Sequence, residues 1–292
     1  MEETSQELHG LGNAVSDLVG VTNDLVDTIS RSKWLPEKLL DLTARAVLVR
    51  QHEGLQSMLL LMRHERGYAA VPLLRPACDE LIWLRYLHTL PIEDANRLLN
   101  LRANQEMGRS IAAQQQFAGS KDMRGLGFGK AFVRHSNRVL RLVEAEMVAL
   151  SHTYGWDIRT TGTVERSDGP GTPFMARATK TEPLYNFLFS ATSRSVHFSL
   201  SELLRRAWGA PGGEVSITSA HFTNYWSRFC LYWGSYLFIG TLAEAVPLIE
   251  GDIDEVLPED RYMKAVEAIG NHGKVPAITV DELATADRTS FL

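Results

Sequence analysis

Two segments of the sequence place polar side chains at helical spacing within otherwise apolar runs. In the first, Arg75 and Asp79 are four residues apart, so a helix would put them on one face, one turn apart. In the second, residues four positions apart would line one helix edge: Tyr185, Phe189, Ser193 and His197. Because a buried arginine without an anionic partner is costly, either Asp79, Glu80 or an anionic ligand must balance Arg75.

Three roles are open for these residues. They can form a buried hydrogen-bonded network that joins two central helices. They can bind a small anion or organise a homo-oligomer, and a defence role is one hypothesis for such a protein. They can also form the site of an RNase or nucleotide-processing enzyme, with the imidazole as acid or base and the arginines on phosphate. In that alternative the catalytic candidates are His197, Arg75, Asp79 and Arg194, and the ligand-binding candidates are Tyr185, Ser193 and Arg85.

The same two segments carry a family resemblance. The segments Arg75-Pro76-x-x-Asp79 and Tyr185…Ser193-x-x-x-His197 resemble a family of helical bacterial proteins that is classed as a domain of unknown function. The resemblance covers about Leu40 to Leu204, and Asp79 stands where we expect Glu in that family. It implies a helical bundle and almost nothing about activity, so whether the chain is an enzyme stays open.

A looser likeness is to HEPN-type helical RNases. In these enzymes an Arg and a His separated by four residues act on RNA, the His in proton transfer and the Arg on phosphate. This chain has no such pair, and only two residues separate Arg194 from His197. An RNase would therefore need Arg75 or Arg85 to supply the charge from the other helix.

Almost the whole chain has the apolar periodicity of helices. Predicted helices span about residues 8–29, 36–62, 68–88, 92–116, 131–151, 183–208, 220–248 and 259–269. Glycines predict a flexible loop over 119–130, and glycines and prolines predict a loop or short hairpin over 152–179, with strand near 160–164. We expect an all-α fold, an irregular multi-helix bundle of about seven or eight helices. A single helical domain would cover 1–270, and a weakly structured C-terminal tail would cover 271–292.

Charge is distributed unevenly along the chain. Between Arg97 and Arg141, nine basic residues against two acidic ones give +7, while Glu244 to Asp260 has seven acidic residues and none basic, −7. The basic stretch predicts binding to nucleic acid or a nucleotide, because such a surface neutralises phosphates. The alternatives are a solvated helix face or an interface with the acidic segment of a second copy, which would be a homo-oligomer.

Several common sites lack their sequence signatures. The run Gly125 to Lys130 resembles a phosphate-binding loop, but Arg124 and Ala131 stand where a Walker loop needs Gly and Ser or Thr. The nine histidines include no pair at i and i+4, and the two cysteines are far apart, so we predict neither a metal nor a cofactor.

The expected location is the cytoplasm. Cys78 and Cys230 lie in apolar helical runs, which is typical of a protein from a reducing compartment, and the N-terminus lacks the pattern of a signal peptide. The segment Phe229 to Ile249 is about long enough to span a bilayer. Because it contains Glu244 and Pro247, we interpret it as a core helix and do not expect a membrane contact.

Overall fold

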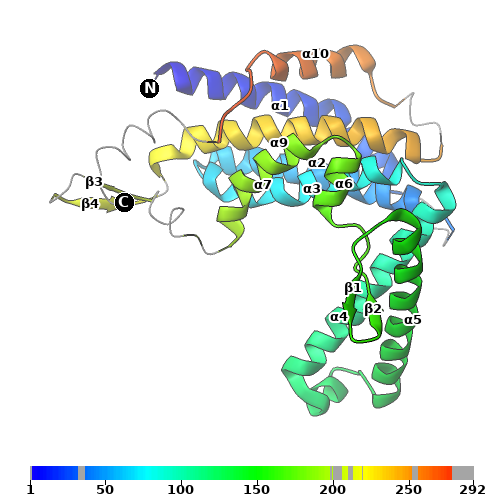
Figure 1. The fold of residues 1–292 in the computed structure, drawn as a ribbon. Coiled ribbons are helices and arrows are strands. Elements are labelled where there is room, and N and C mark those ends of the chain that lie inside the picture. The colour runs from blue at the N-terminus through cyan, green and yellow to red at the C-terminus, as the bar shows by residue number, and fades with distance from the viewer. Residues whose placement is uncertain are drawn as a thin grey trace. The chain divides into compact units, whose positions relative to one another are not determined.

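The computed structural model describes residues 2–31, 37–197, 199, 206–209, 213–218, 220–251 and 256–277. Nine α-helices lie in this part of the chain: α1 (Glu2–Ile29), α2 (Leu39–Arg63), α3 (Val71–Leu87), α4 (Ile92–Gly125), α5 (Lys130–Tyr154), α6 (Thr172–Ala178), α7 (Glu182–Val196), α9 (Thr223–Ala245) and α10 (Glu259–Gly270). Short 3-10 helices are η1 (Gly67–Ala70), η2 (Ala220–Phe222) and η3 (Val246–Leu248). The predicted all-α, multi-helix fold is confirmed (Figure 1).

The strands form two small antiparallel hairpins. They are β1 (Arg159–Thr161) with β2 (Val164–Arg166), and β3 (Ala207–Gly209) with β4 (Val215–Ile217). The first lies in the segment 152–179, which was predicted to form a loop or a short hairpin, and its turn at Gly162 divides the strand predicted over 160–164. In the second, only Ala207 and Trp208 of β3 overlap the helix predicted over 183–208, and β4 lies in the stretch between two predicted helices. α7 ends earlier than predicted, at Val196, and the backbone of His197 is extended (φ −110°, ψ 161°).

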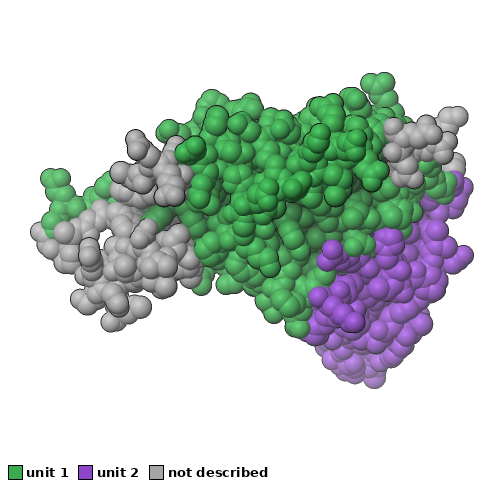
Figure 2. Space-filling model, turned by 90° about the horizontal axis from the view of Figure 1, so that it is seen from above, with its two compact units in different colours: residues 1–33, 41–84, 181–292 green, residues 34–40, 85–180 purple. Residues whose placement is uncertain are grey.

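Internal contacts divide the chain into two compact units (Figure 2). Unit 1 comprises residues 1–33, 41–84 and 181–292, and unit 2 comprises residues 34–40 and 85–180. The boundary falls inside α3, between Leu84 and Arg85. Contacts alone do not define a folding domain, so the single domain over 1–270 stays a prediction. Of the predicted tail, residues 278–292 lie outside the described part of the chain.

Helix α9 forms the centre of unit 1. Phe229, Leu237 and Phe238 have no exposed surface, and α9 packs against η1 and α1, which in turn packs against α10. The approach of η1 is close enough to require glycine, since a Cβ on Gly67 would lie 2.8 Å from Ser227 Cα. The indole of Trp233 also donates a hydrogen bond to the carbonyl of Val275, 2.8 Å away, so α9 anchors the chain after α10.

The apolar character of α9 bears on the question of a membrane. The segment Thr223–Leu248 is long and apolar enough to cross a bilayer by length and composition, and 67% of its most apolar window is buried inside the protein. Burial on this scale is typical of a core helix. The cytoplasmic location stays a prediction.

Unit 2 is built on the long helices α4 and α5, which lie side by side (Figure 1). α4 is broken at Gly119, whose φ of 76° and ψ of 167° are not helical, and a turn after Leu126 leads into α5. The predicted glycine loop is therefore shorter than expected. α5 ends at Gly155 in the left-handed conformation, and β2 packs against α5.

Candidate functional site

The structure brings together part of the group predicted on α3 and α7. The Nε atom of Arg75 lies 3.1 Å from Oδ2 of Asp79, so Asp79 is the acidic partner. The guanidinium carbon of Arg75 lies 4.0 Å from the ring centre of Phe189 and 5.5 Å from that of Tyr185. These distances allow cation–π contact, and the predicted polar faces of α3 and α7 therefore meet at Arg75.

Burial raises the pKa of both acidic residues of α3, and each is paired with an arginine. Burial raises the pKa of Asp79 despite the opposing charge and hydrogen bond of Arg75. Burial likewise raises the pKa of Glu80, which accepts a 3.0 Å hydrogen bond from Gln51 and is paired with Arg50. The pKa of Cys78 rises to about 12, chiefly through burial, so this thiol is not poised as a nucleophile.

The remaining predicted residues do not join this contact. Ser193 is half-buried on α7, whereas Arg194 and His197 are exposed. His197 lies eight residues beyond Phe189, a rise of about 12 Å for a helix. Arg85 is half-buried and belongs to unit 2. Catalytic and ligand-binding roles for these residues stay predictions.

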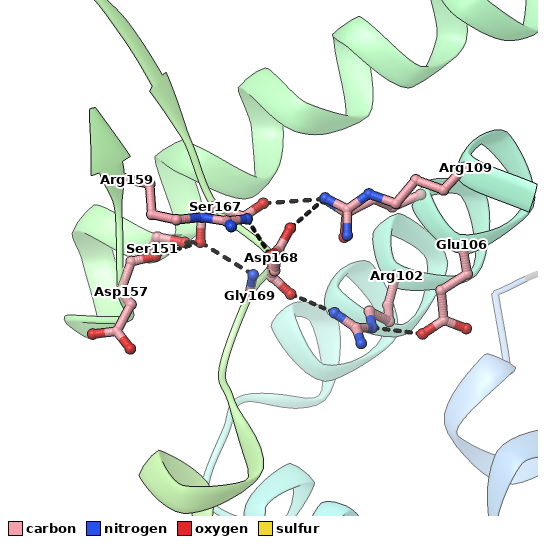
Figure 3. A network of polar contacts seen from close by, with 10 residues as sticks. Arg102, Glu106, Arg109, Ser151, Asp157, Arg159, Ser167, Asp168 and Gly169 are labelled. Carbon is pink, nitrogen blue, oxygen red and sulfur yellow. Dashed lines mark hydrogen bonds and ion pairs between the residues drawn. The ribbon is translucent and has the colours of Figure 1, made fainter. Parts of the chain in front are cut away.

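A second polar group, in unit 2, is centred on Asp168 (Figure 3). Arg109 of α4 is paired with Oδ1 of this carboxylate, and Arg159 of β1 is paired with Oδ2. Arg102 of α4 donates a 2.6 Å hydrogen bond to the carbonyl of Asp168 and is paired with Glu106 at 2.7 Å. One residue thus holds guanidinium groups from two different elements.

The pKa of Asp168 shows which interaction dominates. Burial alone would raise it, but the hydrogen bond and charge of Arg109, with the charges of Arg159 and Arg102, lower it below the ordinary value. Asp168 is therefore ionised at neutral pH, and its attraction to the arginines persists there.

The backbone around Asp168 is fixed by its neighbours. The fully buried Gln105 donates a 3.1 Å hydrogen bond to the carbonyl of Ser167. The hydroxyl of Ser167 lies 2.7 Å from that of Ser151 and donates to the carbonyl of Asp157 at 2.8 Å. Gly169 follows with φ of 75°, and a Cβ there would lie 3.0 Å from the sulfur of Met147. The carboxylate therefore sits on a well-anchored turn.

Beside this turn is a hollow of about 370 Å³, which we name the arginine hollow. It is lined by Arg109, Glu144, Arg159, Thr161 and Arg166. Three arginines against one glutamate give its lining a charge of +2. Arg159 and Arg166 stand directly opposite each other across the β1–β2 pair, an arrangement of like charges that destabilises a hairpin.

Sequence reasoning found only part of this group. Arg102 and Arg109 fall within the basic stretch that was predicted to bind nucleic acid, but Arg159, Arg166 and Asp168 were not singled out. They lie in the segment that was predicted as loop or hairpin. Two arginines flanking a predicted strand were the available signal, since paired strands place such ends together.

The comparison with known proteins identifies the family of this chain. Residues 41–214 match DUF5677, a family of unknown function. The chain belongs to this family. The resemblance to a domain of unknown function is thereby confirmed, whereas the looser likeness to HEPN-type RNases is not confirmed. No curated protein and no solved structure matches the chain. In this DUF5677 protein the matched residues include both the α3–α7 group and the arginine hollow.

Proposed function

We propose that this DUF5677 protein binds phosphate groups of a nucleic acid or nucleotide in the arginine hollow of unit 2. The observation that carries the proposal is the convergence of Arg109, Arg159 and Arg166 on one open hollow of about 370 Å³. Guanidinium groups bind phosphate oxygens through paired N–H donors. A phosphate placed here would relieve the repulsion between Arg159 and Arg166, because it would add negative charge between them.

The ion pairs leave one arginine available. Arg109 and Arg159 are paired with Asp168, whereas Arg166 has no ion-pair partner among the described residues. Asp168 is held on its anchored turn and pairs with two of these arginines, so it orders them without being one of the lining residues. The hollow thus combines two positioned guanidinium groups with a third whose charge is unmatched.

The charges of the two units support a polyanionic ligand for unit 2. In unit 2, 15 Lys and Arg against 10 Asp and Glu give +5, and in unit 1, 15 against 25 give −10. The whole-chain value of −5 conceals this difference. A basic unit in an acidic chain is the charge pattern expected where phosphates bind.

Fluorescence anisotropy of the full chain tests this proposal. The probes are a labelled single-stranded oligonucleotide of about 12 nucleotides and, as unlabelled competitor, inorganic pyrophosphate. We expect the double variant Arg159→Gln/Arg166→Gln to weaken both interactions about tenfold or more, because it removes two charge-assisted contacts. Arg177→Gln is the control, since Arg177 is an exposed arginine of unit 2 outside the lining of the hollow.

The outcomes separate cleanly. Equal affinities for the double variant and the wild type would overturn the proposal, and so would equal losses in the double variant and Arg177→Gln, which would indicate nonspecific charge. Pyrophosphate binding measured by titration calorimetry, without any oligonucleotide binding, would identify a nucleotide or free phosphate as the ligand. The alternatives of anion binding or RNase activity at the α3–α7 group, and of a homo-oligomer, stay predictions.

A further inference from the structure

A second hollow, of about 380 Å³, lies where the end of α4 meets the start of α5, and it differs chemically from the arginine hollow. We name it the aromatic hollow. The lining residues that matter here are the ring of Phe128, the amides of Gln115 and Asn137, and the guanidinium groups of Arg124 and Arg134. We infer that this hollow takes one unstacked base of a single-stranded nucleic acid whose phosphates continue along α5 to the arginine hollow.

The side chains match the parts of a nucleotide. Phe128 is half-buried and pairs with Phe132 at 5.3 Å between ring centres, so its ring is held in place and partly accessible. Aromatic rings of this kind stack on bases without strong sequence preference. The amides of Gln115 and Asn137 each carry a donor and an acceptor, which base edges require, and the two arginines provide charge for the adjoining phosphates.

One face of α5 links the two hollows. Arg134, Asn137, Arg141 and Glu144 are spaced so that they share one face of the helix, and Arg138 borders it. Arg134 and Asn137 line the aromatic hollow, and Glu144 lines the arginine hollow. Glu144 lies ten positions after Arg134, a rise of about 15 Å. The two hollows therefore belong to one track along the helix.

The arginines along this track are available to a ligand. Arg134, Arg138 and Arg141 are exposed, and none has an ion-pair partner in the described part of the chain. A strand with regularly spaced phosphates would match this row better than a single small anion would. The inference thus rests on the proposed function and extends it from one phosphate to a strand.

The chemistry favours a single strand over the other partners of a basic surface. A base can enter a hollow only if it is not stacked in a duplex. A phospholipid offers phosphate but no planar ring that could stack on Phe128. Phe117 and Leu126 are 94% and 60% exposed on the segments around this hollow, so an apolar contact is the alternative that the experiment must exclude.

The experiment uses the full chain and matched substitutions of phenylalanine. Phe128→Leu retains apolar volume and removes stacking, and Phe117→Leu makes the same change at an exposed ring outside the hollow. Binding of a single-stranded oligonucleotide of about 12 nucleotides, as RNA and as DNA, is compared with the duplex of the same length. We expect Phe128→Leu to weaken single-strand binding about tenfold, and Asn137→Ala several-fold, while pyrophosphate binding measured by titration calorimetry and melting temperature stay at wild-type values. Phe117→Leu should have no effect.

Three results would overturn this inference, and each differs from failure of the proposed function. If Phe128→Leu binds the single strand as the wild type does while Arg159→Gln/Arg166→Gln is impaired, the phosphate site stands and the base site is wrong. If phosphatidylserine vesicles retain the protein and Phe117→Ser releases it, with no preference for single strands, the surface is apolar and lipid-binding. If sedimentation shows that Phe128→Leu dissociates an oligomer without affecting oligonucleotide binding, the hollow is occupied by a second copy.

Discussion

Arg45 of unit 1 and Arg159 of unit 2 each pair with a carboxylate but differ in their surroundings. In unit 1, Arg45 is paired with Asp41 and donates to the carbonyl of Glu250, and its side chain is only 11% exposed. In unit 2, Arg159 is paired with Asp168 but is 69% exposed. Arg134, Arg138 and Arg141 of α5, also in unit 2, have no acidic partner among the described residues.

This difference indicates what each set of charges does. A guanidinium that is buried against a carboxylate is part of the folded structure, and removing either partner leaves an uncompensated charge. An exposed guanidinium contributes little to stability and can exchange water for a ligand's phosphate. We therefore expect substitution of the buried Arg45 in unit 1 to affect folding and substitutions on the basic surface of unit 2 to affect binding.

The largest expected contrast is between two phenylalanines. Phe238 of unit 1 has no exposed surface, so Phe238→Ala should lower the free energy of unfolding by about 4 kcal/mol through the cavity it leaves. Phe117→Ala in unit 2 should change it by less than about 0.5 kcal/mol, because that ring is 94% exposed. Urea denaturation followed by tryptophan fluorescence measures both, and similar losses would remove the contrast between the units.

Next in size is an effect on backbone packing. Gly67→Ala should cost about 2 kcal/mol, because the new Cβ would press against the backbone of Ser227. The matched control is Gly54→Ala within α2, where no atom lies within 4 Å of a built Cβ. This second substitution should stabilise the protein by about 0.5–1 kcal/mol. Thermal unfolding of the two variants should therefore shift in opposite directions, and a harmless Gly67→Ala would contradict the close packing of η1 on α9.

Asp168→Asn should have a smaller and pH-dependent effect. Its pKa is lowered in the folded protein, so its stabilising contribution is present above the ordinary value of 3.8 and is lost as pH falls through the folded pKa. We expect a loss of about 0.5–1 kcal/mol at pH 7, reduced by solvent screening, and none in strong acid. Asp79, whose pKa is raised, should show the opposite pH trend. Carboxyl carbon NMR titration measures the pKa of both residues, and pKa shifts in the same direction would contradict this assignment.

The smallest expected effect is the change in protein stability when arginines that line the arginine hollow are substituted. Arg159→Gln/Arg166→Gln should change the free energy of unfolding by less than about 0.5 kcal/mol, because the repulsion it removes offsets the exposed ion pair it breaks. Arg45→Gln should cost more, about 1–3 kcal/mol, because the lost partner leaves Asp41 largely buried. A larger loss in the double variant than in Arg45→Gln would reverse the comparison between the units.

Local patterns predicted much of the fold. The apolar stripe from Leu8 to Ile29 ends where α1 ends, and the four-residue spacing of Arg75 and Asp79 correctly indicated an ion pair on one face of α3. A contact between α3 and α7 was one of the roles left open by the sequence, but the approach of Arg75 to Phe189 itself was not predicted. The helical periodicity of the sequence did not reveal that α7 ends at Val196. Nor did it reveal the pairing of β3 with β4, because helical spacing does not predict contacts between strands.

The arginine hollow could not be predicted in the same way. Arg109 and Asp168 are 59 residues apart, and their contact depends on how the β1–β2 hairpin packs against α5. Sequence spacing carries no information about such an approach. The basic stretch of α4 and α5 included Arg102 and Arg109, whereas the acidic centre Asp168 and the opposed pair Arg159 and Arg166 required the folded structure.

The most direct test of the central claim is the salt dependence of oligonucleotide binding. Anisotropy titrations of the wild type and of Arg159→Gln/Arg166→Gln over a range of salt concentrations give the slope of log affinity against log salt. Each phosphate contact with a single strand contributes about 0.7 to this slope, so the double variant should lose about 1.4, while Arg177→Gln keeps the wild-type slope. A double variant with the wild-type slope and affinity would contradict a phosphate site formed by these arginines.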